Sequence, residues 1–155
     1  MSKIILLVGE ASCGKTTTLK MLIAMFLPYA TICKKRKATT VDALWREIDT
    51  DMKPPSKNPS DFGVVFELFG KKIGIHTKGD SESDIKGVIK FFSSESCDII
   101  VMPCHPNMNH ISLLNSTYGN DIYAIPKQKS GTVQERYFDN ISKANELFQL
   151  ITKLI

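Results

Sequence analysis

The sequence predicts one three-layer α/β/α domain over residues 1–155, built on a mostly parallel sheet of about five strands with one β-hairpin. Apolar runs of strand length alternate with segments whose apolar residues follow a helical period, which is typical of a parallel sheet covered by helices. The chain length suits a single domain. A content of 43% hydrophobic and 23% charged residues is ordinary for globular proteins and excludes disordered, collagen-like and coiled-coil chains.

The expected strands are short apolar runs. Residues 4–8 are continuously apolar, as expected for a strand that is buried on both faces. Two further runs flank Gly70-Lys71, and this arrangement predicts a β-hairpin. Including the two arms of the hairpin, the remaining strands are expected at residues 29–33, 63–69, 72–76, 98–102 and 122–125.

The expected helices show apolar residues at three- and four-residue intervals. In residues 16–27 this spacing continues until Pro28 stops the helix. Residues 81–92 carry one apolar helical face, and residues 107–118 are expected as another helix that ends before Gly119.

Two more segments complete the expected secondary structure. Thr132 and Glu135 have the spacing of a capping box at the start of a long closing helix. Thr40 is a candidate cap for a helix that ends at about residue 48. The proline-rich residues 49–60 are expected to form a surface loop.

Composition and charge narrow the function classes. Four cysteines without paired spacing are expected as reduced thiols, which favours a cytoplasmic location. The net charge of +4 is too small to predict nucleic-acid binding. The longest apolar stretch, residues 19–33, is broken by Pro28 and falls short of a membrane span. We therefore expect neither a membrane nor a nucleic acid as a partner.

The most informative motif is the segment GEASCGKT at residues 9–16, which matches the pattern G-x-x-x-x-G-K-[ST]. It follows a predicted buried strand and opens a predicted helix, which is the context that the pattern requires. Glycines allow successive backbone N–H groups to converge on phosphate oxygens, and the helix N-terminus adds a positive dipole end. Lys15 would reach the β- and γ-phosphates, and the Thr16 hydroxyl would ligate Mg²⁺. The residues expected to hold the phosphates are Gly9, Ala11, Ser12, Cys13, Gly14, Lys15, Thr16 and Thr17.

At these residues the sequence resembles the P-loop NTPase superfamily, and it looks like one of the small single-domain members. The specific match covers residues 4–17, whereas the alternation of strands and helices is similar across most of the chain. The resemblance implies a P-loop NTPase-like fold and a site for a nucleoside triphosphate with Mg²⁺. ATP is the expected nucleotide.

P-loop enzymes also hold Mg²⁺ through a second acid at the carboxyl end of a strand beside the phosphate-loop strand. Asp80 follows the predicted strand 72–76 and is the expected metal-linked and catalytic acid, although it could instead cap the next helix. Asp98 and Asp121 precede their strands and are expected at the opposite edge. Three further carboxylates are weaker candidates for this role: Glu67, Asp49 and Asp51.

Two other features follow predicted strands. Residues 77–80, Thr-Lys-Gly-Asp, match the [NT]KxD pattern by which GTPases read guanine, but here the motif follows a hairpin strand, so we expect no strong preference for GTP. Cys104 and His105 follow the strand 98–102 and are expected at the catalytic edge. There His105 could position water or sense the γ-phosphate as a catalytic residue, or it could be a structural hydrogen-bond partner.

The resemblance does not choose a reaction. The first hypothesis is transfer of the γ-phosphoryl group of ATP to water or to a small acceptor, which Lys15, Thr16, Asp80 and Mg²⁺ could support. One alternative is a nucleotide or other small-molecule kinase, although such enzymes usually clamp phosphates with several arginines and this chain has three: Arg36, Arg46 and Arg136. The other alternative is a nucleotide-dependent binding module that needs a protein partner to supply an arginine.

Overall fold

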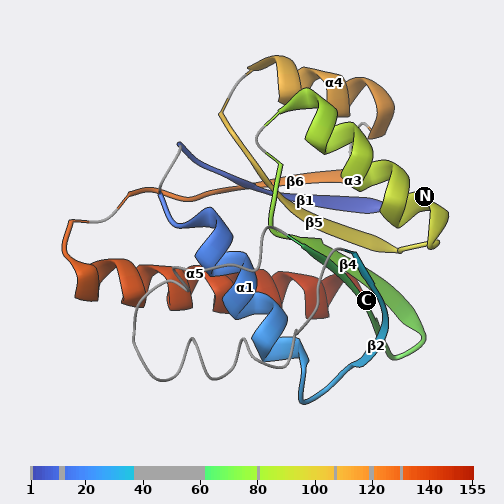
Figure 1. The fold of residues 1–155 in the computed structure, drawn as a ribbon, viewed down its shortest axis with the longest axis horizontal. Helices are drawn as coiled ribbons and strands as arrows, with labels where there is room; N and C mark the ends of the chain where they lie inside the picture. Colours follow the sequence, from blue (N-terminus) through green and yellow to red (C-terminus); the bar gives the residue numbers. More distant parts are fainter. Residues whose placement is uncertain are drawn as a thin grey trace.

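The computed structural model describes residues 2–10, 13–36, 62–79, 81–106, 108–118, 121–129 and 131–155. The helix predicted from Thr40 and the loop predicted over residues 49–60 lie outside these ranges, as do the candidate acids Asp49 and Asp51. Within the described residues, the chain forms an α/β structure in which helices cover both faces of one mixed sheet (Figure 1).

The sheet has six strands in the order β2-β3-β4-β5-β1-β6. The strand β1 (Lys3–Val8), which precedes the motif of residues 9–16, lies between β5 (Ile99–Cys104) and β6 (Ile122–Pro126) and is parallel to both. The strand β4 (Lys71–His76) is parallel to β5 on its other side. The four parallel strands confirm the prediction of a mostly parallel sheet.

The remaining two strands make the sheet mixed. In the described residues each of the six predicted runs forms a strand, one more than the approximate total of five. β3 (Gly63–Leu68) is antiparallel to β4, and β2 (Thr31–Arg36) is antiparallel to β3 at the edge. The predicted hairpin is confirmed, but its turn is formed by Phe69 and Gly70 rather than by Gly70-Lys71. Both turn residues have a positive φ, 52° and 75°, a combination whose twist matches that of antiparallel strands.

The edge strand β2 begins and ends later than the predicted range of residues 29–33. Its second half contains the basic residues that were expected to follow it, and Lys34 forms an ion pair with Glu95 at 2.7 Å. An edge strand leaves many side chains in solvent, so lysines are compatible with pairing and also discourage further strand addition. The pattern of apolar residues therefore placed the C-terminal end of this strand too early.

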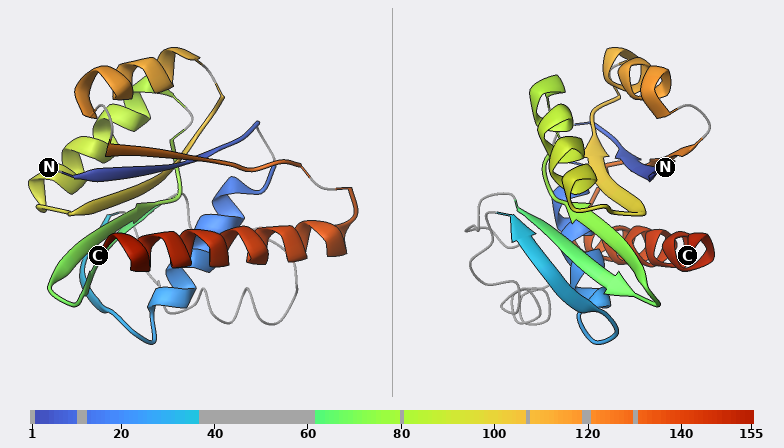
Figure 2. Two further views of the ribbon diagram at one scale, coloured as in Figure 1. Left: turned by 180° about the vertical axis from the view of Figure 1, so that it is seen from behind. Right: turned by 90° about the vertical axis from the view of Figure 1, so that its right-hand side faces the viewer.

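The described helices cover both faces of the sheet, and Figure 2 shows this arrangement from two further sides. The first pair is α1 (Lys15–Phe26) and α5 (Val133–Leu154), which pack side by side. The second pair is α3 (Glu82–Ser94) and α4 (Met108–Tyr118). Each begins within a residue or two of its predicted start, because each carries an apolar face that one side of the sheet covers.

The helix starts follow the cap residues in the sequence. The Thr132 hydroxyl accepts a hydrogen bond from the Glu135 N–H at 3.1 Å, and the Glu135 carboxylate accepts one from the Thr132 N–H at 3.2 Å, which confirms the predicted capping box. The N-cap of α3 is Ser81, whose hydroxyl accepts from the Asp84 N–H. The alternative role of Asp80 as the cap of this helix is therefore wrong.

Alternate residues of β1 point into two separate apolar layers, which confirms that this strand is buried on both faces. The layer beneath α1 and α5 includes Ile5, Leu7, Leu19, Leu22, Phe26, Phe66 and Leu147. The layer beneath α3 and α4 includes Ile4, Leu6, Ile85, Val88, Phe92, Ile100 and Leu114.

The parallel strands bring their carboxyl ends to one edge of the sheet. Val8, His76, Cys104 and Pro126 end β1, β4, β5 and β6 there, and ligands of open parallel sheets bind outside this edge. No helix in the described part of the chain is long and apolar enough to cross a membrane.

Candidate functional site

The loop between β1 and α1 is shaped by its two glycines. Gly14 has φ +98° and is the N-cap of α1, and a Cβ atom at this position would lie 2.5 Å from Asn140 Oδ1. The Gly9 N–H donates to the Cys104 carbonyl at 3.1 Å, and a Cβ atom at Gly9 would lie 2.5 Å from both Cys13 Sγ and the Lys127 carbonyl oxygen. Both positions therefore require glycine for steric reasons, and Gly14 also for its left-handed backbone.

Lys15 folds back over this loop. Its side chain is buried, with 7% of the residue exposed, and its ammonium donates to the carbonyl oxygens of Gly9 and Glu10. The distance to the Glu10 oxygen is 3.0 Å. The ammonium thus lies against the backbone of the loop, at the N-terminus of α1.

Thr16 connects the loop to the end of β4. Its exposed hydroxyl donates to the Thr77 carbonyl at 3.3 Å. Thr17 and Cys13 are buried. Ala11 and Ser12, the other expected phosphate-binding residues, lie outside the described residues.

The strand that leads to Asp80 does not lie directly beside the phosphate-loop strand, because β5 separates β4 from β1. That part of the expectation is wrong. The segment after β4 nevertheless approaches the site, because a Cβ atom at Gly79 would lie 2.2 Å from the Pro103 carbonyl oxygen at the end of β5. Asp80 itself lies outside the described residues, so its role stays a prediction.

The other described carboxylates considered as metal ligands in the sequence analysis lie at the sheet edge opposite the loop of residues 9–16. Glu67 pairs with Lys72 at the start of β4, on the edge opposite the phosphate loop, so it is wrong as a candidate metal acid. Asp98 lies at that same edge, where its carboxylate accepts from the Lys72 N–H at 2.9 Å, as predicted from its place before the strand. Asp121 likewise precedes β6.

His105 lies at the phosphate loop, as the sequence predicted from its place after β5. Its Nε2 is 3.1 Å from the Glu10 carboxylate, and the two side chains are 40% and 74% exposed. Cys104 is the last residue of β5 and is buried. Burial raises the pKa of its thiol, and the nearby Lys15 ammonium partly opposes that rise.

Two buried polar residues hold the loop from behind, and the sequence analysis gave neither of them this role. Lys127, which follows β6, donates from Nζ to the Cys13 carbonyl at 2.9 Å. Asn140 on α5 accepts from the Thr18 hydroxyl at 3.3 Å. A signal for Asn140 exists in the sequence, because a polar residue occupies the helix face that Ala144, Leu147 and Ile151 also occupy.

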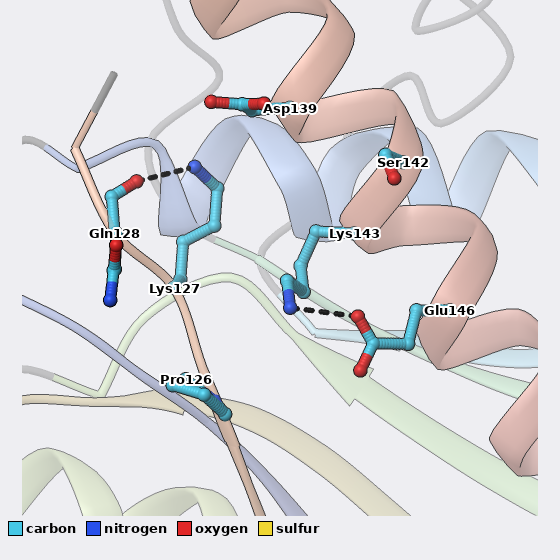
Figure 3. A pocket seen from close by; sticks show the side chains of 7 residues that line it. All are labelled: Pro126, Lys127, Gln128, Asp139, Ser142, Lys143 and Glu146. Atoms are coloured by element: carbon cyan, nitrogen blue, oxygen red, sulfur yellow. Dashed lines mark hydrogen bonds and ion pairs between the residues drawn. The ribbon is translucent and has the colours of Figure 1, made fainter.

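A pocket of about 340 Å³ lies beside Lys127, between the end of β6 and α5 (Figure 3). Its lining is polar and of mixed charge, and it includes Asp139 and the ion pair between Lys143 and Glu146, whose charged atoms are 2.7 Å apart. The Lys127 side chain belongs both to the pocket wall and to the support of the phosphate loop.

Neither a cluster of metal ligands nor a similarity to a known protein identifies the ligand of this site. In the described ranges, no three His, Cys, Asp or Glu side chains gather closely enough to hold a metal ion. The chain matched no protein-family model, no curated protein and no solved structure. The function is therefore inferred from the residues of the chain itself.

Proposed function

We propose that this protein binds ATP with Mg²⁺ at residues 9–17 and transfers the γ-phosphoryl group to water or to a small acceptor. The observation that carries this proposal is the position of the Lys15 ammonium against the carbonyl groups of Gly9 and Glu10. A phosphate at this loop would replace neutral acceptors with anionic ones, and such charge-assisted hydrogen bonds are about twice as strong as neutral ones.

The backbone around Lys15 supports phosphate binding. Gly14 caps α1 and has no side chain, so the N-cap residue supplies no side-chain acceptor to the first N–H groups of the helix. The helix dipole places partial positive charge at the same end. Lys15 and the helix N-terminus therefore favour the same anionic ligand.

Thr16 fits the expected role at Mg²⁺. Its hydroxyl hydrogen points to the Thr77 carbonyl, so the oxygen lone pairs remain available to a metal ion. Bound Mg²⁺ would supply neutralisation of charge on the phosphates. Asp80 follows the same segment three residues after Thr77 and remains the proposed second acid.

His105 is the proposed residue for the reacting end of the nucleotide. Its imidazole is held beside the loop by the Glu10 carboxylate, which orients the ring and leaves Nδ1 available for water or an acceptor hydroxyl. Because Glu10 belongs to the loop itself, movement of the loop and of the ring would be coupled.

One observation favours the alternative of a nucleotide-dependent binding module. The Arg136 Nε donates to the Thr132 carbonyl at 3.4 Å, at the start of α5. This is the arginine whose side chain the structure describes, and it serves the helix terminus. An arginine supplied by a partner protein would then complete the charge neutralisation. The same observation disfavours a small kinase, which would need several arginines of its own.

Phosphorus NMR of the purified protein with Mg²⁺ and ATP separates these functions. Free phosphate without an added acceptor would establish a hydrolase, and new diphosphate signals that require pooled nucleoside monophosphates would establish a kinase. Intact ATP together with saturable binding would establish the binding module. Absence of both binding and turnover would contradict the proposal. The same series with GTP tests the choice of ATP, which tenfold tighter GTP binding would contradict.

A further inference from the structure

Lys127 connects three parts of the site from beneath. Its backbone N–H donates to the Val8 carbonyl at 2.7 Å, at the end of β1. Its ammonium donates to the Cys13 carbonyl at 2.9 Å, inside the phosphate loop, and to the Gln128 carbonyl at 3.0 Å. The residue is 4% exposed. Lysine is rarely buried to this degree, so this placement calls for a physical reason.

We propose that Lys127 is a positioning residue of the phosphate site, which aims the Gly14 N–H at the nucleotide by holding the Cys13 carbonyl. The Cys13 carbonyl and the Gly14 N–H belong to one peptide unit, and the structure contains no cis peptide bond in its described residues. In a planar trans peptide the C=O and N–H point in opposite directions. An ammonium that fixes the carbonyl behind the loop therefore directs the N–H to the front. This inference rests on the proposed function.

The positive charge of Lys127 would also favour binding of an anionic ligand. No carboxylate of the described residues forms an ion pair with the ammonium, whose acceptors are the two carbonyl groups. A buried ammonium that lacks a contacting anion is stabilised by any negative charge that arrives nearby. A polyphosphate on the other side of a single loop would supply that charge, so Lys127 would favour binding without touching the ligand.

The surroundings of Lys127 set the sign of its pH response. Burial lowers the pKa of the ammonium, and Lys143 on α5 lowers it further, whereas Cys13 in the loop and Asp139 on α5 oppose the change. Glu146 lies across the same pocket, paired with Lys143 (Figure 3). Bound phosphate would raise the pKa of Lys127 again. MgATP affinity should therefore fall as rising pH removes the proton, in a range that begins below the ordinary lysine pKa of about 10.5.

Lys127→Met and Lys127→Gln test the inference, with Lys129→Met as the matched control. Lys129 is exposed two residues further along, so its substitution removes the same charge from the same loop. MgATP affinity is measured by calorimetry from pH 7.5 to 10. The carbonyl carbon chemical shift of Cys13, which reports hydrogen bonding to that oxygen, is measured by NMR on the protein without nucleotide. Folding of each variant is checked by circular dichroism.

We expect Lys127→Met to weaken MgATP binding by about tenfold and to shift the Cys13 carbonyl carbon resonance, because that oxygen loses its hydrogen bond. Lys127→Gln, which keeps a donor without the charge, should restore the carbonyl resonance while still binding weakly. Lys129→Met should match the wild type. The wild type and Lys129→Met should lose affinity between pH 8 and 10 more steeply than both Lys127 variants.

Wild-type affinity, wild-type pH slope and an unchanged Cys13 carbonyl resonance in Lys127→Met would overturn the inference. If Lys127→Met does not fold, Lys127→Gln with the wild-type pH slope would overturn it equally. Failure of the wild type to bind MgATP would refute the proposed function instead. In that case an unchanged Cys13 carbonyl resonance in Lys127→Met would also show that Lys127 does not hold the loop.

Discussion

The loop between β1 and α1, the proposed phosphate site, has a buried side and an exposed side, and the two are held differently. Behind the loop, Lys127 and Asn140 are both nearly excluded from solvent and bind the segment 13–18 through hydrogen bonds. In front of it, the Thr16 hydroxyl and the His105–Glu10 pair are exposed and make single contacts. Removal of a hydrogen-bond partner destabilises the protein when the remaining polar group is buried, because that group then has no partner. An exposed polar group forms a hydrogen bond to water instead.

The buried contacts and the exposed residues of this loop therefore have different roles. The buried side comes from the C-terminal part of the chain, after β6 and on α5, and it fixes the backbone of the loop. The exposed side comes from the ends of β4 and β5 and is free to adapt to a ligand. Substitutions behind the loop should therefore lower stability and binding together, and substitutions in front should change turnover with little effect on stability.

The largest effect is expected for Lys15→Met, which keeps the side-chain stem but removes the ammonium. Hydrogen bonds to charged groups contribute about 1.5–3 kcal/mol each, so MgATP affinity should fall by about 100-fold or more. Calorimetric titration measures this loss. Lys86→Met is the control, because Lys86 is an exposed residue of α3 that pairs with Glu82. Affinity that is unchanged in Lys15→Met would contradict the site assignment.

A smaller effect is expected for Gly14→Ala, which tests the buried side through the backbone. The new Cβ atom would meet Asn140 Oδ1 and would hold a non-glycine residue at φ +98°, so the free energy of unfolding should fall by about 1–3 kcal/mol. Gly70→Ala is the matched control, since Gly70 also has a positive φ but has open space around its Cβ position. Chemical denaturation should show a larger loss for Gly14→Ala. Equal losses would mean that contact with Asn140 contributes nothing.

Thiol alkylation gives an intermediate test of burial that needs no nucleotide. Cys33 is exposed, whereas Cys13, Cys97 and Cys104 are buried, so Cys33 should be labelled first and Cys13 should be protected in the folded loop. Slight burial and the nearby Glu67 carboxylate raise the pKa of the Cys33 thiol above 9.0. Because the thiolate is the reactive form, labelling of Cys33 should keep increasing past pH 9.

Two comparisons sharpen the labelling experiment. Glu67→Gln should accelerate the labelling of Cys33 at pH 8, because it removes a carboxylate that raises the pKa. Cys97, whose pKa burial raises to about 12, should react only after unfolding. Mass spectrometry of peptides identifies each labelled site. Labelling of Cys13 as fast as that of Cys33 would contradict a well-packed buried side.

The smallest effect on stability is expected for His105→Gln on the exposed side. An exposed ion pair contributes about 0–1 kcal/mol, so thermal unfolding should change little. Release of phosphate should slow severalfold, because the ring would no longer position water. Comparison with Glu10→Gln, which removes the other partner of the pair, shows whether both act together. Wild-type turnover in His105→Gln would assign the histidine a structural role.

Much of the fold could be predicted because local pattern and burial agree. The continuous apolar run of β1, the capping box at Thr132 and the helical spacing in α1 and α5 each specify an element through neighbours in the chain. The exceptions share a physical reason. The lysines of β2 belong to a strand because they pair with β3, which lies elsewhere in the sequence. The turn at Phe69-Gly70 follows from the register of β3 against β4, which places Leu68 opposite Lys71. Local periodicity contains neither of these pairings.

The candidate site divides in the same way. The sequence by itself determined the motif of residues 9–16 and its place between a buried strand and a helix. It also determined the edges at which His105 and Asp98 lie, because one residue follows and the other precedes the same strand of a parallel sheet. Only the tertiary structure decided that β5 separates β4 from β1 and that Lys127 and Asn140 support the loop. The contacts of Lys127 and Asn140 join residues more than 100 positions apart, and their partners are chosen by packing in three dimensions rather than by spacing in the chain.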